Sequence, residues 1–115
     1  MSFDLIVEAL IGYGLRNIPE SPVKEMIEWA NRQSALRIAL DVPAALEATL
    51  GRTMETRFKA DVILTLALPK HGLTNKIAGK ILLADLGIPE GIFQKIIPNY
   101  KSPFDQTFIA ELDRI

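Results

Sequence analysis

Residues 36–45 read LRIALDVPAA, and this stretch decides the predicted fold. Its first five residues form an apolar run interrupted only by Arg37, which is typical of a short strand buried on both faces of a parallel sheet. Pro43 prevents the ladder from continuing, so Asp41 falls where the strand ends. Ligands of open α/β sheets bind outside the carboxyl ends of the strands. Asp41 is therefore the first candidate for chemistry, and the alternative is that it only caps the following turn.

The segment before this strand predicts a strand and a helix. Residues 3–10, FDLIVEAL, favour a strand that ends near Glu8. Ser21 and Pro22 predict the start of an amphipathic helix, with serine as N-cap and proline as first helical residue, ending near residue 33. Trp29 is expected to pack at the edge of this helix. Strand, helix and strand within about 38 residues indicate a right-handed, parallel βαβ unit.

The segment after residue 45 continues the alternation. We expect a short helix over 44–50, a loop over 52–59, a strand over 60–68, a helical turn over 74–78 and a strand over 81–86. The tail predicts a turn of helix over 92–97 and a last helix over 108–112. These elements predict an α/β fold with a mostly parallel sheet of about four strands. Residues 1–89 are interpreted as one half domain, and residues 90–115 as an extension that packs on it.

Composition narrows the class of protein. The chain has 115 residues, of which 49% are hydrophobic, and its mean hydropathy is +0.19. This excess predicts an apolar face that another subunit or a missing part of a longer chain covers. The net charge of −1 without a basic block argues against nucleic acid and anionic membranes as partners. The chain has no cysteine, no apolar run long enough to span a membrane and no pattern of a signal peptide, which fits a cytoplasmic protein.

Three charged residues follow predicted parallel strands and are expected to meet at one edge of the sheet. These are Glu8, Asp41 and Lys70, with the loop of Gly12 and Gly14 beside them. Two carboxylates, a lysine and an amide-rich loop suit binding of a phosphorylated ligand and proton transfer. The alternatives are an ordinary cluster of polar residues and a tight glycine turn. Asp61 is expected at the opposite edge without a role, and His71 lacks the partners of a metal site.

Four motifs in order resemble a known family. DLIVEALIGYGL, ALDVPAALEATLG, ADVILTLALPKHGL and AGKILLADLGIP are similar to the second half of the YjeF N-terminal domain family, over roughly residues 3–89. The resemblance implies a Rossmann-like three-layer α/β/α sandwich. It also implies an isomerase, an NAD(P)H-hydrate epimerase, which binds the hydrated dinucleotide and a potassium ion at the carboxyl edge. Such an enzyme interconverts two epimers at the hydrated carbon of the nicotinamide ring.

The resemblance assigns roles to particular residues. Asp41 would be the ligand-binding, catalytic carboxylate, Lys70 matches the family lysine after the third strand, and Glu8 stands where the family has a potassium-binding aspartate. The loop that would approach the phosphates of the dinucleotide consists of Gly12, Tyr13, Gly14, Leu15 and Arg16.

The departures from the family pattern leave three hypotheses. Ala44 and Ala45 replace a Ser-Gly pair, Glu47 replaces an aspartate, and the first half of the family domain has no counterpart in this chain. The chain would be part of an epimerase that a second chain completes, a non-catalytic module for binding or self-association, or another nucleotide-binding α/β module. Expected partners are hydrated NAD(P)H and either further copies of the chain or a second half domain.

Overall fold

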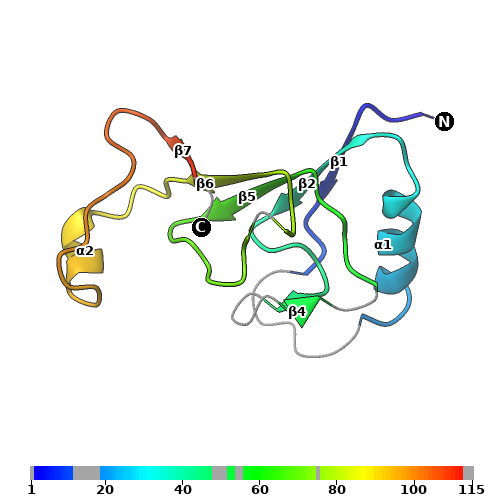
Figure 1. Ribbon diagram of the computed structural model, residues 1–115, viewed down its shortest axis with the longest axis horizontal. Coiled ribbons are helices and arrows are strands. Elements are labelled where there is room, and N and C mark those ends of the chain that lie inside the picture. The colour runs from blue at the N-terminus through cyan, green and yellow to red at the C-terminus, as the bar shows by residue number, and fades with distance from the viewer. Residues whose placement is uncertain (1, 12–18, 48–51, 54–55, 75, 113–115) are drawn as a thin grey trace.

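The computed structural model describes residues 2–11, 19–47, 52–53, 56–74 and 76–112. Its main feature is a five-stranded sheet with the order β1-β2-β5-β6-β7 (Figure 1). The first four of these strands are mutually parallel, and β7 runs antiparallel to β6. The strands are β1 (Leu5–Glu8), β2 (Leu36–Leu40), β5 (Val62–Leu66), β6 (Lys80–Ala84) and β7 (Ile109–Glu111). The predicted α/β fold with a mostly parallel sheet is confirmed.

Helix α1 (Val23–Asn31) connects β1 to β2, as the sequence predicts. Ile27 and Ala30 are buried against the sheet because they lie on the apolar stripe of the helix. The helix begins one residue later than expected, with Pro22 as the N-cap residue. The Ser21 hydroxyl donates to the Glu25 carboxylate at 2.6 Å and makes no cap to the backbone.

Two predicted helices are wrong. Where a helix is expected over 44–50, the described part contains strand β3 (Leu46–Glu47). β3 pairs with β4 (Arg52–Thr53) in a second, antiparallel sheet. The segment 52–59, expected as a loop, therefore begins with a strand. Residues 109–111 form β7 because the outer edge of β6 offers unpaired hydrogen-bonding groups to the returning chain.

A short helix, α2 (Glu90–Gln94), overlaps the turn expected over 92–97 and lies at the end of the molecule away from α1 (Figure 1). Across the described residues, the helices fall short of the length and apolarity that a membrane span requires.

The core lies on one face of the main sheet, which we call the inner face. All buried residues of the five strands point to it: Glu8, Ala39, Ile63, Thr65, Ile81 and Leu83. The connections β1 to β2, β2 to β5 and β5 to β6 all pack there, contributing Ile27, Phe58 and Leu73 to one cluster. The strands follow one another in a single direction, so right-handed crossovers place every connection on the same side.

The opposite face of the sheet is apolar and uncovered, and we call it the open face. Leu5, Val7 and Leu36 on this face are 48%, 56% and 49% exposed. In Figure 1, α1 and the segment that carries β4 lie on the same side of the sheet and leave the other side bare. The strand register places on the open face Leu5, Val7, Leu36, Ile38, Leu40, Val62, Leu64, Leu66, Leu82, Ala84 and Ile109. Its one described ion pair, between Lys80 and Glu111, lies at the β6–β7 end of this face.

The molecule is extended for its length. It measures 45 × 30 × 22 Å, with a radius of gyration of 15.1 Å, whereas a compact domain of this size has about 13 Å. The segment around α2 projects from the sheet and lengthens the molecule (Figure 1).

Candidate functional site

Asp41 and Lys70 meet at the carboxyl edge of the main sheet. Asp41 directly follows β2, and Lys70 lies in the turn after β5, the parallel neighbour of β2. Lys70 Nζ donates to Asp41 Oδ1 at 2.6 Å and to the Leu66 carbonyl at 2.7 Å. The Lys70 and Asp41 side chains are 18% and 22% exposed. The ion pair is therefore shielded from bulk water but within reach of a ligand.

The two oxygens of the Asp41 carboxylate have different surroundings. Oδ1 accepts from the Thr65 hydroxyl at 3.1 Å, from the Leu66 amide at 3.3 Å and from Lys70. Oδ2 accepts no hydrogen bond from the part of the chain that the structure describes, where every buried side-chain oxygen has a partner. With respect to the described residues, Oδ2 is consequently the oxygen left for solvent or a ligand. A carboxylate fixed through one oxygen with the other presented outward suits ligand binding and proton transfer.

The backbone at this edge takes left-handed conformations. Asp41, Ala45 and Ala67 have φ values of 67°, 66° and 61°. Aspartate tolerates this region, whereas it costs alanine roughly 1–2 kcal/mol. Such conformations cluster at functional sites, where the surrounding structure holds them in place. The resemblance implies a glycine where this chain has Ala45, and a positive φ favours glycine over alanine at that position.

Ala67→Gly is expected to stabilise the protein by about 0.5 kcal/mol. The substitution removes strain of roughly 1–2 kcal/mol, and the greater freedom of glycine in the unfolded chain offsets part of that gain. Urea unfolding measures the change, and Ala84→Gly, within strand β6, is the control and should destabilise by about 0.5–1 kcal/mol. A loss of stability in Ala67→Gly as large as that of the control would contradict the assigned backbone.

Glu8 lies at the same edge, and backbone amides of this chain already donate hydrogen bonds to its carboxylate. Its side chain is buried, with 4% of the residue exposed. Oε1 accepts from the Leu10 amide at 2.7 Å, and Oε2 accepts from the Ala44 amide at 2.9 Å. Glu8 therefore fastens the end of β1 to the turn after β2. It makes no hydrogen bond to Asp41 or Lys70 within the described residues.

Among the described residues, the side chains around Glu8 supply few oxygen ligands for a potassium ion. A cation needs several oxygen lone pairs directed at one point. Each Glu8 oxygen already accepts one backbone N–H, and Ala44 has no hydroxyl where the family has a serine. The described ranges contain no group of three or more histidine, aspartate or glutamate residues that would hold a metal. No step of a reaction is assigned to a metal here.

Three other sequence expectations concern the glycine loop, His71 and Trp29. The glycine loop, residues 12–16, lies outside the described residues. His71 is exposed beside Lys70 and belongs to no metal-binding group in the described chain. Trp29 packs edge-on against Phe3, with ring centroids 5.6 Å apart, which is the packing position expected at the helix edge.

Thr65 is the member of the site that sequence reasoning missed. It is fully buried, on the inner face of β5, and its hydroxyl holds Asp41 Oδ1. The signal is present in the sequence, because Thr65 is the one polar side chain inside the apolar run 62–68, VILTLAL. A buried hydroxyl needs a partner, and the nearest strand end supplies the Asp41 carboxylate.

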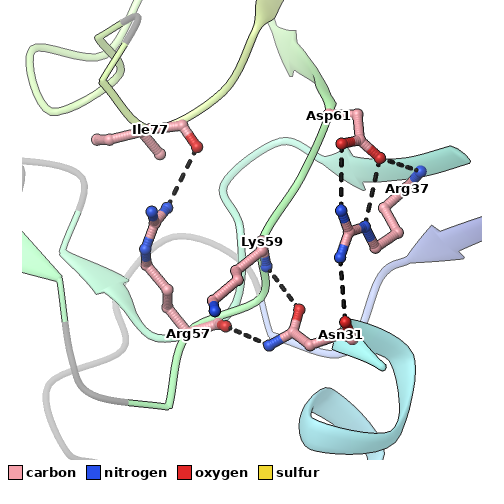
Figure 2. Close-up of polar contacts among 6 residues, drawn as sticks. All are labelled: Asn31, Arg37, Arg57, Lys59, Asp61 and Ile77. Atoms are coloured by element: carbon pink, nitrogen blue, oxygen red, sulfur yellow. Dashed lines mark hydrogen bonds and ion pairs between the residues drawn. The ribbon is translucent and has the colours of Figure 1, made fainter. Parts of the chain in front are cut away.

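The opposite, amino edge of the sheet carries a polar network of a structural kind (Figure 2). Arg37 donates to both carboxylate oxygens of Asp61, at 3.2 and 3.3 Å, and to the Asn31 carbonyl. The Asn31 side-chain amide bridges the Arg57 carbonyl and the Lys59 backbone amide at 2.8 Å each. This network links the end of α1 to the irregular segment that precedes β5. Asp61 lies at this edge, as predicted, with Arg37 as its partner.

The Asp61 network predicts a pH dependence of stability. The hydrogen bond and charge of Arg37 hold the pKa of Asp61 below its ordinary value of 3.8. A lowered folded-state pKa stabilises the protein above the unfolded pKa, and this contribution is lost as pH falls through the folded value. Because Asp61 is 42% exposed, we expect Asp61→Asn to cost about 1 kcal/mol or less at pH 7. Urea unfolding at pH 7 and at about pH 2.5 should show the difference shrinking, and a constant difference would contradict the assignment.

An apolar cavity lies away from Asp41 and Lys70. It has a volume of about 400 Å³ and opens between β1 and α1. Its walls are mainly apolar and include Leu10, Met26 and Trp29, with Glu8 at one end. The cavity therefore borders the outer edge of β1 and lacks the polar groups that a nucleotide phosphate requires.

Comparison with known proteins adds a family and a fold. A family model described as "YjeF-related protein N-terminus" matches residues 1–72. The crystal structure of yeast ynu0 superposes with a TM-score of 0.76 at 17% identity, covering 95% of this chain and 46% of the yeast chain. At that identity the likeness concerns the fold, which is that of the mostly parallel sheet described above.

Curated relatives are longer than this chain. An NAD(P)H-hydrate epimerase of Dehalogenimonas lykanthroporepellens is 36% identical over 110 residues, which cover 95% of this chain and 45% of the relative. An NAD(P)H-hydrate epimerase of Rhodopirellula baltica is 37% identical over 90 residues, which cover 75% of this chain and 37% of the relative. The chain thus spans less than half the length of these two relatives.

Proposed function

The chain belongs to the family of YjeF-related N-terminal domains, and from this membership we propose that it carries the Asp41 side of an NAD(P)H-hydrate epimerase site. The substrate would be hydrated NADH or NADPH, whose hydroxyl-bearing ring carbon is inverted. The names of the relatives support the reaction. The observation that carries the proposal is the Asp41–Lys70 pair, held at the carboxyl edge with Asp41 Oδ2 open.

Asp41 would supply the proton transfers of the reaction. A carbon that bears a hydroxyl group can be inverted by loss and return of water. The hydroxyl must receive a proton to leave as water, and a base must accept a proton from the water that returns. Asp41 Oδ2 would serve both steps, and this is supported by the hydrogen bonds that hold the other oxygen, from Thr65, Leu66 and Lys70. Lys70 orients the carboxylate and presents its ammonium group to the anionic dinucleotide.

The loop at residues 12–16 remains our proposal for the dinucleotide phosphates, supported by the sequence GYGLR alone. The family resemblance implies a potassium ion. The two amides that donate to Glu8 compete with such an ion for the carboxylate in this chain. Location in the cytoplasm also stays a prediction. For association, a second half domain is proposed ahead of self-association, because it would cover the open face with helices that this chain does not supply.

The proposal is tested by following one pure epimer of hydrated NADH over time. We expect the other epimer to appear faster than in buffer when the chain is combined with the first half of a relative's domain, supplied as a separate polypeptide. The hydrate of NADPH is tested in parallel. If neither hydrate epimerises faster with this mixture than in buffer, the proposed reaction is wrong for this chain.

A non-catalytic binding module is the second candidate. Ala44 and Ala45 stand at the family Ser-Gly position and favour this candidate, because they remove a hydroxyl from the edge. The hydrogen bond from the Ala44 amide to the Glu8 carboxylate also favours it, because it competes with a cation for that oxygen. A rise in melting temperature with hydrated NADH, without epimerisation, would select this candidate.

A further inference from the structure

The hydrogen bonds that the described residues make to the Asp41 carboxylate converge on one oxygen. Oδ1 accepts from the Thr65 hydroxyl, the Leu66 amide and Lys70 Nζ. A carboxylate has about four lone-pair sites, roughly two for each oxygen. These donors therefore leave no site on Oδ1 for a proton, and a proton that Asp41 takes up must reside on Oδ2.

The fold itself places Thr65 beside Asp41. Leu40 of β2 pairs with Leu64 of β5, so the next residues along the two parallel strands, Asp41 and Thr65, are neighbours across the sheet. The Asp41 amide donates to the Leu64 carbonyl at 2.8 Å, which continues the ladder beyond the end of β2. Thr65 is fully buried, so its hydroxyl is sealed from water, and its β-branched side chain is restricted at χ1. The strands therefore fix the position of this donor.

Lys70 is a less constant donor than Thr65. Its ammonium group is shared between Asp41 Oδ1 and the Leu66 carbonyl, at the mouth of the site. The lysine stem is flexible, and the anionic phosphates of a dinucleotide attract its charge. When Lys70 turns toward such a ligand, the Thr65 hydroxyl at 3.1 Å is the shorter of the two bonds that still hold Oδ1, since the Leu66 amide is 3.3 Å away.

We propose that Thr65 is a positioning residue, which keeps the proton of Asp41 on Oδ2 without itself contacting the ligand. The effect on the rate rests on the epimerisation proposed above, whereas the hydrogen bond exists in the chain without substrate. A carboxyl group free to carry its proton on either oxygen would direct it away from the ligand part of the time, and misplaced reacting groups lower the rate. Thr65 would thus affect the rate of the reaction more than the affinity for the substrate.

The alternative is that Thr65 only fills space on the inner face of β5. Valine has nearly the shape of threonine but lacks the hydroxyl, whereas serine keeps the hydroxyl and lacks the methyl group. A packing role predicts that Thr65→Val is tolerated and that Thr65→Ser is the harmful change, because serine leaves a void in the core. A positioning role predicts the reverse order for the rate. The two substitutions therefore separate the explanations.

The first experiment needs no substrate. Carbon-13 NMR of the whole 115-residue chain, labelled at the aspartate carboxyl groups, records the Asp41 resonance in the wild type, Thr65→Val and Thr65→Ser. We expect Thr65→Val to shift this resonance, because the carboxylate loses a donor, and Thr65→Ser to return it toward the wild-type position. The Asp61 resonance, from the opposite edge of the sheet, should stay fixed in all three proteins.

The second experiment measures epimerisation of hydrated NADH by each variant, combined with the first half of a relative's domain. We expect Thr65→Val to lower kcat about tenfold or more with KM within about twofold of the wild type, and Thr65→Ser to restore kcat to within about threefold. Thr56→Val is the matched control and should leave kcat unchanged, because Thr56 is half-buried and shares a cavity with Asn31 and Lys59 at the amino edge. Urea unfolding checks that every variant is folded.

Three results would overturn the inference. One is an Asp41 resonance that Thr65→Val leaves in place, and another is a kcat that Thr65→Val leaves unchanged. The third is a kcat that Thr65→Ser lowers as much as Thr65→Val does, which would assign Thr65 to packing. If the wild-type mixture does not epimerise hydrated NADH, the proposed reaction is wrong. A resonance shift that Thr65→Ser reverses would still support Thr65 as the residue that orients Asp41, and a fixed resonance would overturn it.

Discussion

Asp41→Asn is expected to lower the epimerisation rate by about 10²- to 10⁴-fold, the range over which positioned acid–base groups act. Asparagine keeps a carbonyl oxygen for the Thr65 hydroxyl and the Leu66 amide, but it has no oxygen that can take up and return a proton. Asparagine also tolerates the left-handed conformation of residue 41, so the variant should fold. The rate is measured from the decay of one epimer of hydrated NADH.

Asp61→Asn is the matched control for this prediction. It makes the same chemical change at the opposite edge of the sheet, where Asp61 pairs with Arg37. Its rate should stay within about twofold of the wild-type rate, because the residue lies at the far end of the strand from the carboxyl edge. If Asp41→Asn retains full activity while its affinity for the substrate is unchanged, Asp41 is not the reacting group.

Glu8→Ala is expected to lower the free energy of unfolding by about 3 kcal/mol. The substitution removes two hydrogen bonds to a buried carboxylate and leaves the amides of Leu10 and Ala44 without their acceptor. Such a loss is a large part of the total stability of a small domain, which is about 5–15 kcal/mol. Guanidinium unfolding of the two proteins measures it.

Two variants sharpen the interpretation of Glu8. Glu28→Ala removes an exposed carboxylate whose ion pair with Lys24 is 3.9 Å long, and it should cost less than about 1 kcal/mol. Glu8→Gln keeps one acceptor and should fall between Glu8→Ala and the wild type. A potassium-specific gain in stability that disappears in Glu8→Ala would contradict the assigned role and restore Glu8 as a cation ligand.

Much of the central sheet and the core of the site could be predicted from the sequence. The apolar runs of β2 and β5 are long enough to identify, and parallel strands necessarily bring their ends to one edge. The sequence therefore predicts that Asp41 and Lys70 lie together, and in the structure they form an ion pair. Thr65 was missed because a single hydroxyl inside a strand is usually satisfied locally, and its partner depends on the neighbouring strand.

The errors have tertiary causes. The composition of 44–50, AALEATL, favours a helix, but Glu8 holds the Ala44 amide, and Ala45 takes a left-handed conformation that interrupts a helix there. Residues 109–111 were predicted as helix, and they form a strand because the edge of β6 lies beside them. The role of Glu8 as a cation ligand stays a prediction, and the backbone amides from which its oxygens accept could not be inferred from the sequence spacing.

The most direct test of the central claim is carbon-13 NMR of protein labelled at the aspartate carboxyl groups, with and without hydrated NADH. The sample is this chain combined with the first half of a relative's domain. The resonances of Asp41 and Asp61 are assigned from their disappearance in Asp41→Asn and Asp61→Asn. If the ligand binds at the carboxyl edge, the Asp41 resonance shifts on addition of hydrated NADH and the Asp61 resonance does not. A titration in which the Asp41 resonance stays fixed while the ligand is bound would contradict the account.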